Sequence, residues 1–194
     1  GEQLVATLRP AFDEIDTRLA ALSALRERPS GTVRITSSRH AAETILWPAV
    51  SRMLKDYPEV SVEISIDGQL TDIITDRFDA GIRLGEQVAK DMIAVPIGPD
   101  LRMVVVGSPD YLAARGRPQT PQDLTAHACI NIRMPSKGGL YAWEFGKDGR
   151  DLNVRVEGRL VVNDVPLILR AAAEGVGLAC VLEDQAARQL ASGE

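Results

Sequence analysis

The first thirty residues carry apolar positions at alternating spacings of three and four, with polar residues between them. On a helix this spacing places the apolar side chains along one seam, as in a coiled coil. An ordinary amphipathic helix packed on its own domain fits a repeat of this length equally well. The sequence therefore predicts a linker and dimerisation helix over residues 1–28, with the seam formed by Val5, Leu8, Phe12, Ile15, Leu19 and Leu22.

Beyond Pro29, Ser30 and Gly31, which are expected to end this helix, strand and helix patterns alternate. The predicted elements are a strand over 31–38, a helix over 41–57 with a kink or late start at Pro48, a strand over 60–66, a helix over 69–78 and a strand over 79–84. This order predicts a parallel sheet with helices on its faces.

The second half of the chain opens with an extended crossover over 95–100. The continuous apolar run over 101–107 is typical of a buried central strand. The pair Asp148-Gly149 predicts a β-hairpin between 141–145 and 152–156. The other predicted elements are short helices at 109–115 and 121–126, strands at 129–133, 158–163 and 178–182, and helices at 164–174, ended by Gly175, and 183–191.

Composition adds limits to this picture. The chain has 194 residues, 45% of them hydrophobic, and a formal net charge of −5. It contains no apolar run long enough for a membrane span and no pattern of a signal peptide. Cys129 and Cys180 lie in apolar, strand-like contexts, which favour buried reduced thiols and a cytoplasmic location. Since no cluster of Lys and Arg alternates with aromatic residues, contact with nucleic acid is expected to come from elsewhere.

Six motifs occur in an order that resembles the effector-binding part of a LysR-type transcriptional regulator. In the first half they are Ser30-Gly-Thr-Val-Arg-Ile-Thr-Ser-Ser38 after the heptad helix, Leu46-Trp-Pro48 with Tyr57-Pro58, and Phe78-Asp-Ala-Gly-Ile-Arg-Leu-Gly85. In the second half they are Val106-Gly-Ser-Pro-Asp-Tyr-Leu112, Thr120-Pro-Gln-Asp-Leu124 and Ala171-Ala-Ala-Glu-Gly-Val-Gly177. The resemblance extends over nearly the whole chain.

The resemblance implies an α/β protein with the two-lobed, periplasmic-binding-protein-like (type 2) fold, preceded by the linker helix. The lobes would span residues 31–96 and 97–194, with a small-molecule effector held between them. It also implies a winged helix-turn-helix ahead of Gly1 that contacts DNA, and a segment after Glu194 that closes the first lobe. The expected assembly is a homodimer or homotetramer, without a membrane partner.

Candidate site residues follow from the parallel sheet, because ligands bind beyond the carboxyl ends of such strands. The segment Thr36-Ser37-Ser38-Arg39 joins the first strand to its helix, and Val162-Asn163-Asp164 has the same place in the second half. Plain helix capping explains such residues about as well. The resemblance favours the ligand interpretation, since the family builds its cleft from these two loops and the strand after the crossover. By position, three more residues are added: Asp67, Arg83 and Asn131. Each fits solvated surface equally well, and Arg83 has possible partners in Asp79 and Glu86.

An arginine among hydroxyl groups suits a small organic anion such as an organic acid. Trp47 and Trp143 are candidates for an aromatic wall. By contrast, Asp67 and Asp164 favour a ligand with hydroxyl or amine donors. The sequence leaves these alternatives open, and it indicates no cofactor and no metal site.

Two other functions compete with ligand-controlled transcription. A solute-binding protein of a transport system shares the lobed architecture, but it would have a secretory signal in place of the heptad helix. An enzyme would need convergent acid and base groups. His40 follows two serines without a nucleophile-elbow motif, and His127 and Cys129 lack further metal-ligating neighbours. The sequence therefore predicts no catalytic residues.

Overall fold

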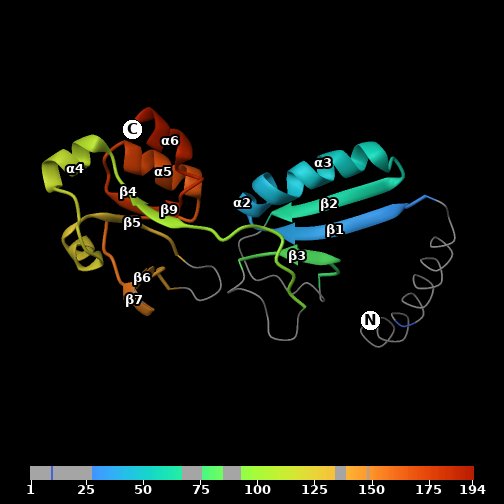
Figure 1. Cartoon of the computed structure of the whole chain (residues 1–194), viewed down its shortest axis with the longest axis horizontal. Coiled ribbons are helices and arrows are strands. Elements are labelled where there is room, and N and C mark those ends of the chain that lie inside the picture. Colours follow the sequence, from blue (N-terminus) through green and yellow to red (C-terminus); the bar gives the residue numbers. More distant parts are fainter. Residues whose placement is uncertain (1–9, 11–27, 67–75, 85–92, 134–138, 148) are drawn as a thin grey trace, which may run out of the picture. The chain divides into compact units, whose positions relative to one another are not determined.

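The computed structural model describes residues 10, 28–66, 76–84, 93–133, 139–147 and 149–194 (Figure 1). The chain divides into two compact units, residues 1–98 and 99–194, and each unit is described by itself. The predicted coiled-coil seam, Asp67 and residues 69–75 of the predicted helix over 69–78 lie outside the described residues. The last three residues of that predicted helix, 76–78, are described and are not helical.

The first unit contains a parallel sheet with the strand order β2-β1-β3. Its strands are β1 (Gly31–Ser37), β2 (Val60–Ile66) and β3 (Ala80–Ile82). The register of β1 on β2 runs from Gly31 opposite Val60 to Ser37 opposite Ile66. All three strands therefore end at the same edge, which confirms the predicted parallel sheet and places Ser37 and Arg83 at that edge.

A single helical path follows β1 and passes through Pro48 without a break. It consists of α2 (Arg39–Ala41), a π-helical turn (Ala42–Leu46) and α3 (Trp47–Asp56). The N–H of Trp47 bonds to the carbonyl of Ala42, five residues earlier. A π turn widens the helix locally, so the ring of Pro48 is accommodated beyond it. Leu46 and Val50 are buried, whereas Trp47 is 58% exposed.

The second unit has a four-stranded sheet with the order β4-β9-β5-β8. Its strands are β4 (Met103–Val106), β5 (Cys129–Asn131), β8 (Leu160–Val161) and β9 (Leu178–Leu182). Strands β5, β8 and β9 are parallel, and β4 is antiparallel to β9. The candidate residues Asn131 and Asn163 thus follow two neighbouring parallel strands.

The prediction of a central strand over 101–107 is wrong, because β4 is the last of the described strands in its sheet. Its side chains nevertheless meet apolar clusters on both faces. Val104 and Val106 pack against one cluster and Val105 against the other. Contact on two faces, rather than a central position, explains the continuous apolar run.

Two apolar cores lie on the two faces of this sheet. One includes Ile130, Ala179 and Val181 beneath α5 (Val165–Ala173). The other includes Cys129, Cys180 and Trp143. Trp143 is only 1% exposed in this second core, so it does not form the aromatic wall considered above.

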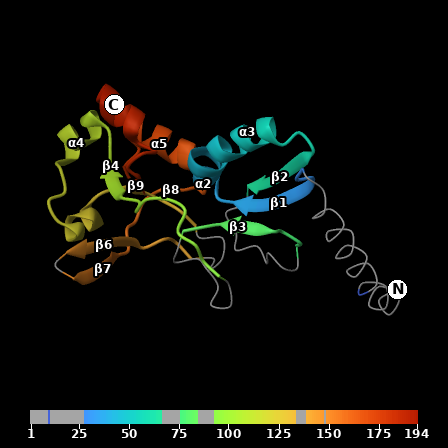
Figure 2. The same ribbon diagram turned by 45° about the vertical axis from the view of Figure 1, so that its right-hand side comes forward.

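The remaining elements of the second unit decorate its sheet (Figures 1 and 2). Strands β6 (Trp143–Lys147) and β7 (Arg150–Val154) pair antiparallel, which confirms the predicted hairpin. Strand β8 is shorter than the predicted strand over 158–163. The described helices also include α4 (Pro109–Arg115), a 3-10 helix (Pro121–Ala126) and α6 (Ala187–Ser192), which begins later than predicted because a turn occupies 183–186.

Candidate functional site

The carboxyl edge of the first sheet brings Ser37, Ser38 and Arg83 together. Ser37 ends β1 and is fully buried, and its Oγ donates to the carbonyl of Ser38 at 3.0 Å. The carbonyl of Ile82, the last residue of β3, accepts both the N–H of Ser38 at 3.4 Å and Nη1 of Arg83 at 2.9 Å. One backbone oxygen therefore joins the two loops.

Ser38 has the backbone conformation of an N-cap, and its Oγ accepts from the N–H of Ala41 at 3.4 Å. Ser38 therefore caps the helix, as the capping alternative predicted. Nη1 of Arg39 lies 3.8 Å from Oε1 of Glu43, one helical turn later. Both side chains of that pair are largely exposed, so the pair contributes little to stability.

Arg83 is anchored across the sheet. Its Nη2 donates to Oγ1 of Thr36 at 2.8 Å, in addition to the bond from Nη1 to Ile82. Asp79, one partner considered from the sequence, accepts the N–H of Arg34 at 2.8 Å. The other, Glu86, lies outside the described residues.

In the second unit, Asn163 and Asp164 connect β8 to α5 and are both exposed. Asp164 is the N-cap of α5, and its Oδ1 accepts from the N–H of Leu167 at 3.0 Å. An aspartate at this position also interacts favourably with the positive end of the helix.

Asn131 differs from the other candidates because it is only 2% exposed. Its Oδ1 accepts from the N–H of Ile132 at 2.8 Å, and its Nδ2 donates to the carbonyl of Val156 at 3.3 Å. Both ends of the amide therefore bind backbone, which ties the end of β5 to the segment that follows β7.

Sequence reasoning included Thr36 only as one of the hydroxyl groups of its loop, and it did not select the pair of Arg102 and Glu183 at the carboxyl end of β9. Nη1 of Arg102 lies 3.4 Å from Oε1 of Glu183, and the backbone N–H of Glu183 bonds to the carbonyl of Arg102 at 2.9 Å. No local pattern signals this pair, because the two residues meet only through the antiparallel pairing of β4 and β9.

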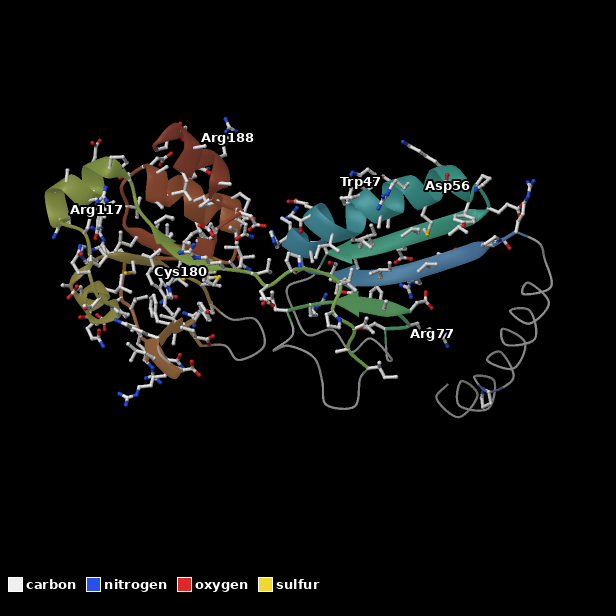
Figure 3. All side chains as sticks on the ribbon, in the orientation of Figure 1. Trp47, Asp56, Arg77, Arg117, Cys180 and Arg188 are labelled. Carbon is white, nitrogen blue, oxygen red and sulfur yellow. The ribbon has the colours of Figure 1, made fainter. Side chains whose placement is uncertain are left out.

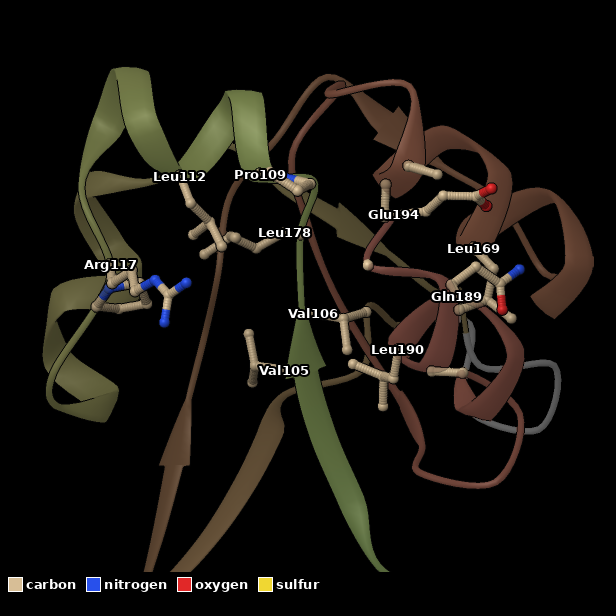
Figure 4. A pocket seen from close by; sticks show the side chains of 16 residues that line it. Val105, Val106, Pro109, Leu112, Arg117, Leu169, Leu178, Gln189, Leu190 and Glu194 are labelled. Carbon is tan, nitrogen blue, oxygen red and sulfur yellow. The ribbon is translucent and has the colours of Figure 1, made fainter.

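A cavity of about 410 Å³ lies in the second unit, away from the ends of β5 and β8 that carry Asn131 and Asn163 (Figure 4). It is formed where β4 ends and β9 begins, and Val106, Leu112 and Leu178 contribute to its apolar wall. Gly193 and Glu194 also line it. None of the candidate residues lies in this cavity.

Both cysteines are buried and unpaired, as predicted, and Cys180 lies in the interior of its unit (Figure 3). Burial raises the pKa of the Cys129 thiol to about 11 and that of Cys180 to about 12. In the described part of the chain, no three His, Cys, Asp or Glu side chains gather as metal ligands. The described helices include none that is long and apolar enough to cross a membrane.

Comparisons with known proteins agree with this fold. The sequence profile of the LysR substrate binding domain matches residues 26–194. The chain is 50% identical over 193 residues to a putative transcriptional regulator of Pseudomonas aeruginosa, covering 100% of this chain and 63% of that protein. It is 46% identical over 190 residues to the HTH-type transcriptional regulator PgrR of Escherichia coli, covering 98% of this chain and 64% of that protein.

Among solved structures, the full-length virulence activator AphB of Vibrio cholerae, a member of the LTTR protein family, has a TM-score of 0.72 and 20% identity. The match covers 100% of this chain and 65% of that chain. The chain thus spans less than two thirds of the length of these relatives. The comparisons confirm the predicted two-lobed, periplasmic-binding-protein-like fold. The chain belongs to the LysR substrate binding domain family and is related to LysR-type transcriptional regulators.

Proposed function

We propose that this chain is the effector-sensing part of a LysR-type transcriptional regulator. A small molecule binds at the polar loops that follow the parallel strands, and its occupancy shifts the balance between arrangements of the oligomer that bind DNA differently. DNA is contacted by a winged helix-turn-helix outside this chain. The net charge of −5 supports this division, because an acidic sensor is poorly suited to binding phosphates.

The observation that carries the proposal is the polar edge of the first sheet. A helix begins there with a serine cap, and an anchored guanidinium lies beside it through the shared Ile82 carbonyl. Helix N-terminal N–H groups and arginine both favour an anion. We therefore assign a small carboxylate as the effector class, with Ser37, Ser38, Arg39 and Arg83 as the residues of the first unit.

The second unit contributes Asn131, Asn163 and Asp164, and the first also contributes Asp67. A carboxylate at Asp164 would repel an anion, so this residue favours a hydroxyl or amine donor on the effector. A small hydroxy acid has both features. Asn131 is buried and bonded to backbone, so its proposed part is to support the loop that carries Asn163.

The proposed protein works in the cytoplasm as a homodimer or homotetramer, with no cofactor, metal or catalytic residue. The buried, unpaired cysteines are compatible with a reducing compartment. The heptad pattern over residues 1–28 supports association through a helix seam.

Thermal unfolding of the full-length protein tests the effector class. Lactate and mandelate are compared with their neutral amides, lactamide and mandelamide. The carboxylates are expected to raise the melting temperature because they bind only the folded state. An equal shift by the amides would contradict an anionic effector.

Three variants locate the site. Ser38→Ala and Asn163→Ala are expected to weaken the response to the carboxylates while the protein stays folded. Ser108→Ala is the matched control, because Ser108 caps α4 through the N–H of Tyr111 at 3.2 Å and belongs to none of the polar loops. If both site variants respond as the wild type does, the assigned site is wrong.

A further inference from the structure

The position of Arg83 depends on Thr36, a residue buried to 0% exposure in β1. Thr36 pairs with Gly81 of β3. Arg83 lies two residues beyond Gly81, so strand periodicity places both on the same side of the sheet. Arg83 is therefore a diagonal neighbour of Thr36, within reach of a long side chain. The 2.8 Å bond from Nη2 to Oγ1 of Thr36 makes use of this geometry.

No side chain at position 81 stands between these two residues, because Gly81 has none. The second bond, from Nη1 to the carbonyl of Ile82 at 2.9 Å, fixes the plane of the guanidinium. A guanidinium has five N–H donors in a rigid fork, so fixing its plane also fixes the directions in which the remaining donors point. A buried hydroxyl and a backbone carbonyl thus both contribute to the orientation of this cation.

We propose that Thr36 is a positioning residue for anion recognition: its buried hydroxyl holds the guanidinium of Arg83 at the sheet edge beside Ser38, oriented toward the carboxylate of the effector. The inference rests on the proposed function. It extends that function by assigning the orientation of the arginine to a residue that does not itself touch the ligand.

Preorganisation is the physical reason for such a device. An arginine that already has its binding orientation loses less conformational freedom when a carboxylate arrives. The hydrogen bond from a charged donor is also stronger than one between neutral groups. Loss of the Thr36 hydroxyl therefore affects both the mobility of Arg83 and the affinity for an anion.

The test uses the rate at which phenylglyoxal modifies Arg83 in the full-length protein, measured by peptide mass spectrometry. Thr36→Val keeps the shape of the side chain but removes the hydroxyl. It is expected to raise the rate of modification about tenfold, because Arg83 loses a hydrogen bond from a charged donor to a neutral acceptor. Thr36→Ser retains the hydroxyl and is expected to react at nearly the wild-type rate. Arg170, which pairs with Glu174 on an exposed face, is the internal control.

Mandelate and lactate are then added as probes. They are expected to slow the modification of Arg83 in the wild type and in Thr36→Ser, but not in Thr36→Val. A role of Thr36 in stability alone would lower the melting temperature without changing this protection. If Thr36→Val does not fold, Thr36→Ala provides a second variant without the hydroxyl, and thermal unfolding shows which of the two is folded.

The outcomes separate the two proposals. A wild-type rate for Arg83 in the folded variant without the hydroxyl overturns the positioning role. Protection by the carboxylates that persists in this variant overturns the link from Thr36 to the ligand. If the carboxylates protect Arg83 in no protein, the anionic effector class assigned under the proposed function is wrong, whatever the rate in the variants.

Discussion

At the scale of single residues, Arg34 joins more of the first unit than any pattern in the sequence indicates. Its Nε and Nη2 contact the two carboxylate oxygens of Glu63 at 3.0 and 3.1 Å, and its guanidinium carbon lies 5.1 Å from the centre of the Phe78 ring. Its Nη1 donates to the carbonyls of Asp76 and Arg77, each at 3.1 Å. These bonds tie β1 to β2 and to the segment before β3.

Glu63 gives this cluster a pH dependence. The hydrogen bond from Arg34 holds the pKa of Glu63 below its ordinary value of 4.5. A lowered pKa in the folded state adds stability above the unfolded value, and this contribution is lost as the pH falls through the folded value. We expect Glu63→Gln to reduce the loss of stability between pH 5 and pH 3, measured by urea unfolding at about half-unit steps of pH.

Arg34→Lys tests the geometry of the same cluster, because lysine keeps the charge but has no planar fork for two carboxylate oxygens. We expect it to lower the melting temperature. Arg170→Lys is the matched control, since its pair with Glu174 is exposed and spans a single helical turn. Equal effects of the two substitutions would show that the shape of the Arg34 guanidinium contributes nothing.

The two cysteines give a third prediction at this scale. Their thiols have a raised pKa in the folded state, so their contribution to stability is present below the ordinary value of 9.0 and is lost as the pH rises toward about 11 and about 12. At pH 8 we expect a thiol reagent such as DTNB to react with neither cysteine in the native protein and with both in urea. Rapid reaction of the native protein would contradict the burial of Cys129 and Cys180.

At the scale of elements, hydrophobic periodicity predicted the helices and strands whose formation depends on residues close together in the sequence. Strand β2 and helix α4 have the predicted bounds, and the hairpin follows from the Asp148-Gly149 pair. The edge position of β4 could not be predicted, because it depends on which strands pair in the sheet. The apolar run instead reflects contacts with clusters on both faces. The π turn before Pro48 is a compromise between a proline and a helix that continues, and no residue pattern specifies it.

The candidate site likewise contains residues that local patterns identify and contacts that depend on distant parts of the chain. Ser38 and Asp164 were found because N-caps have a local signature, and the carboxyl ends of the strands could be counted along the chain. The bond from Arg83 to Thr36 was not predicted, because it connects residues brought together only by the pairing of β1 with β3. The bond from the buried Asn131 amide to the carbonyl of Val156 likewise joins residues that are distant in sequence, since Val156 lies beyond the hairpin.

Gly149 supplies a prediction for the hairpin. Its φ is +72°, in the left-handed region, where a side chain costs about 1–2 kcal/mol. We expect Gly149→Ala to lower the free energy of unfolding by about this amount. Gly146→Ala, in β6 of the same hairpin, is the control, because an added Cβ there meets only Oδ1 of Asp151 at an ordinary 3.7 Å. Equal losses for both variants would exclude backbone strain as the cause.

At the scale of the whole molecule, the proposal joins a ligand sensor to an oligomer. The double substitution Leu8→Asp with Ile15→Asp places two charges on the predicted seam. We expect light scattering on the full-length protein to show the loss of one level of association, since charged residues are disfavoured at such positions. Asp13→Lys with Glu14→Lys, at outer positions of the same repeat, serves as a control. An unchanged mass of the seam variant would remove the coiled coil from the account.

Hydrogen exchange on the full-length protein, with and without mandelate or lactate, tests the central claim most directly. The account predicts slower exchange in the loops after the parallel strands, residues 36–42 and 161–167, with unchanged exchange in the hairpin over 143–154. Protection confined to the hairpin or to the cavity around Val106, with both loops unchanged, would contradict it.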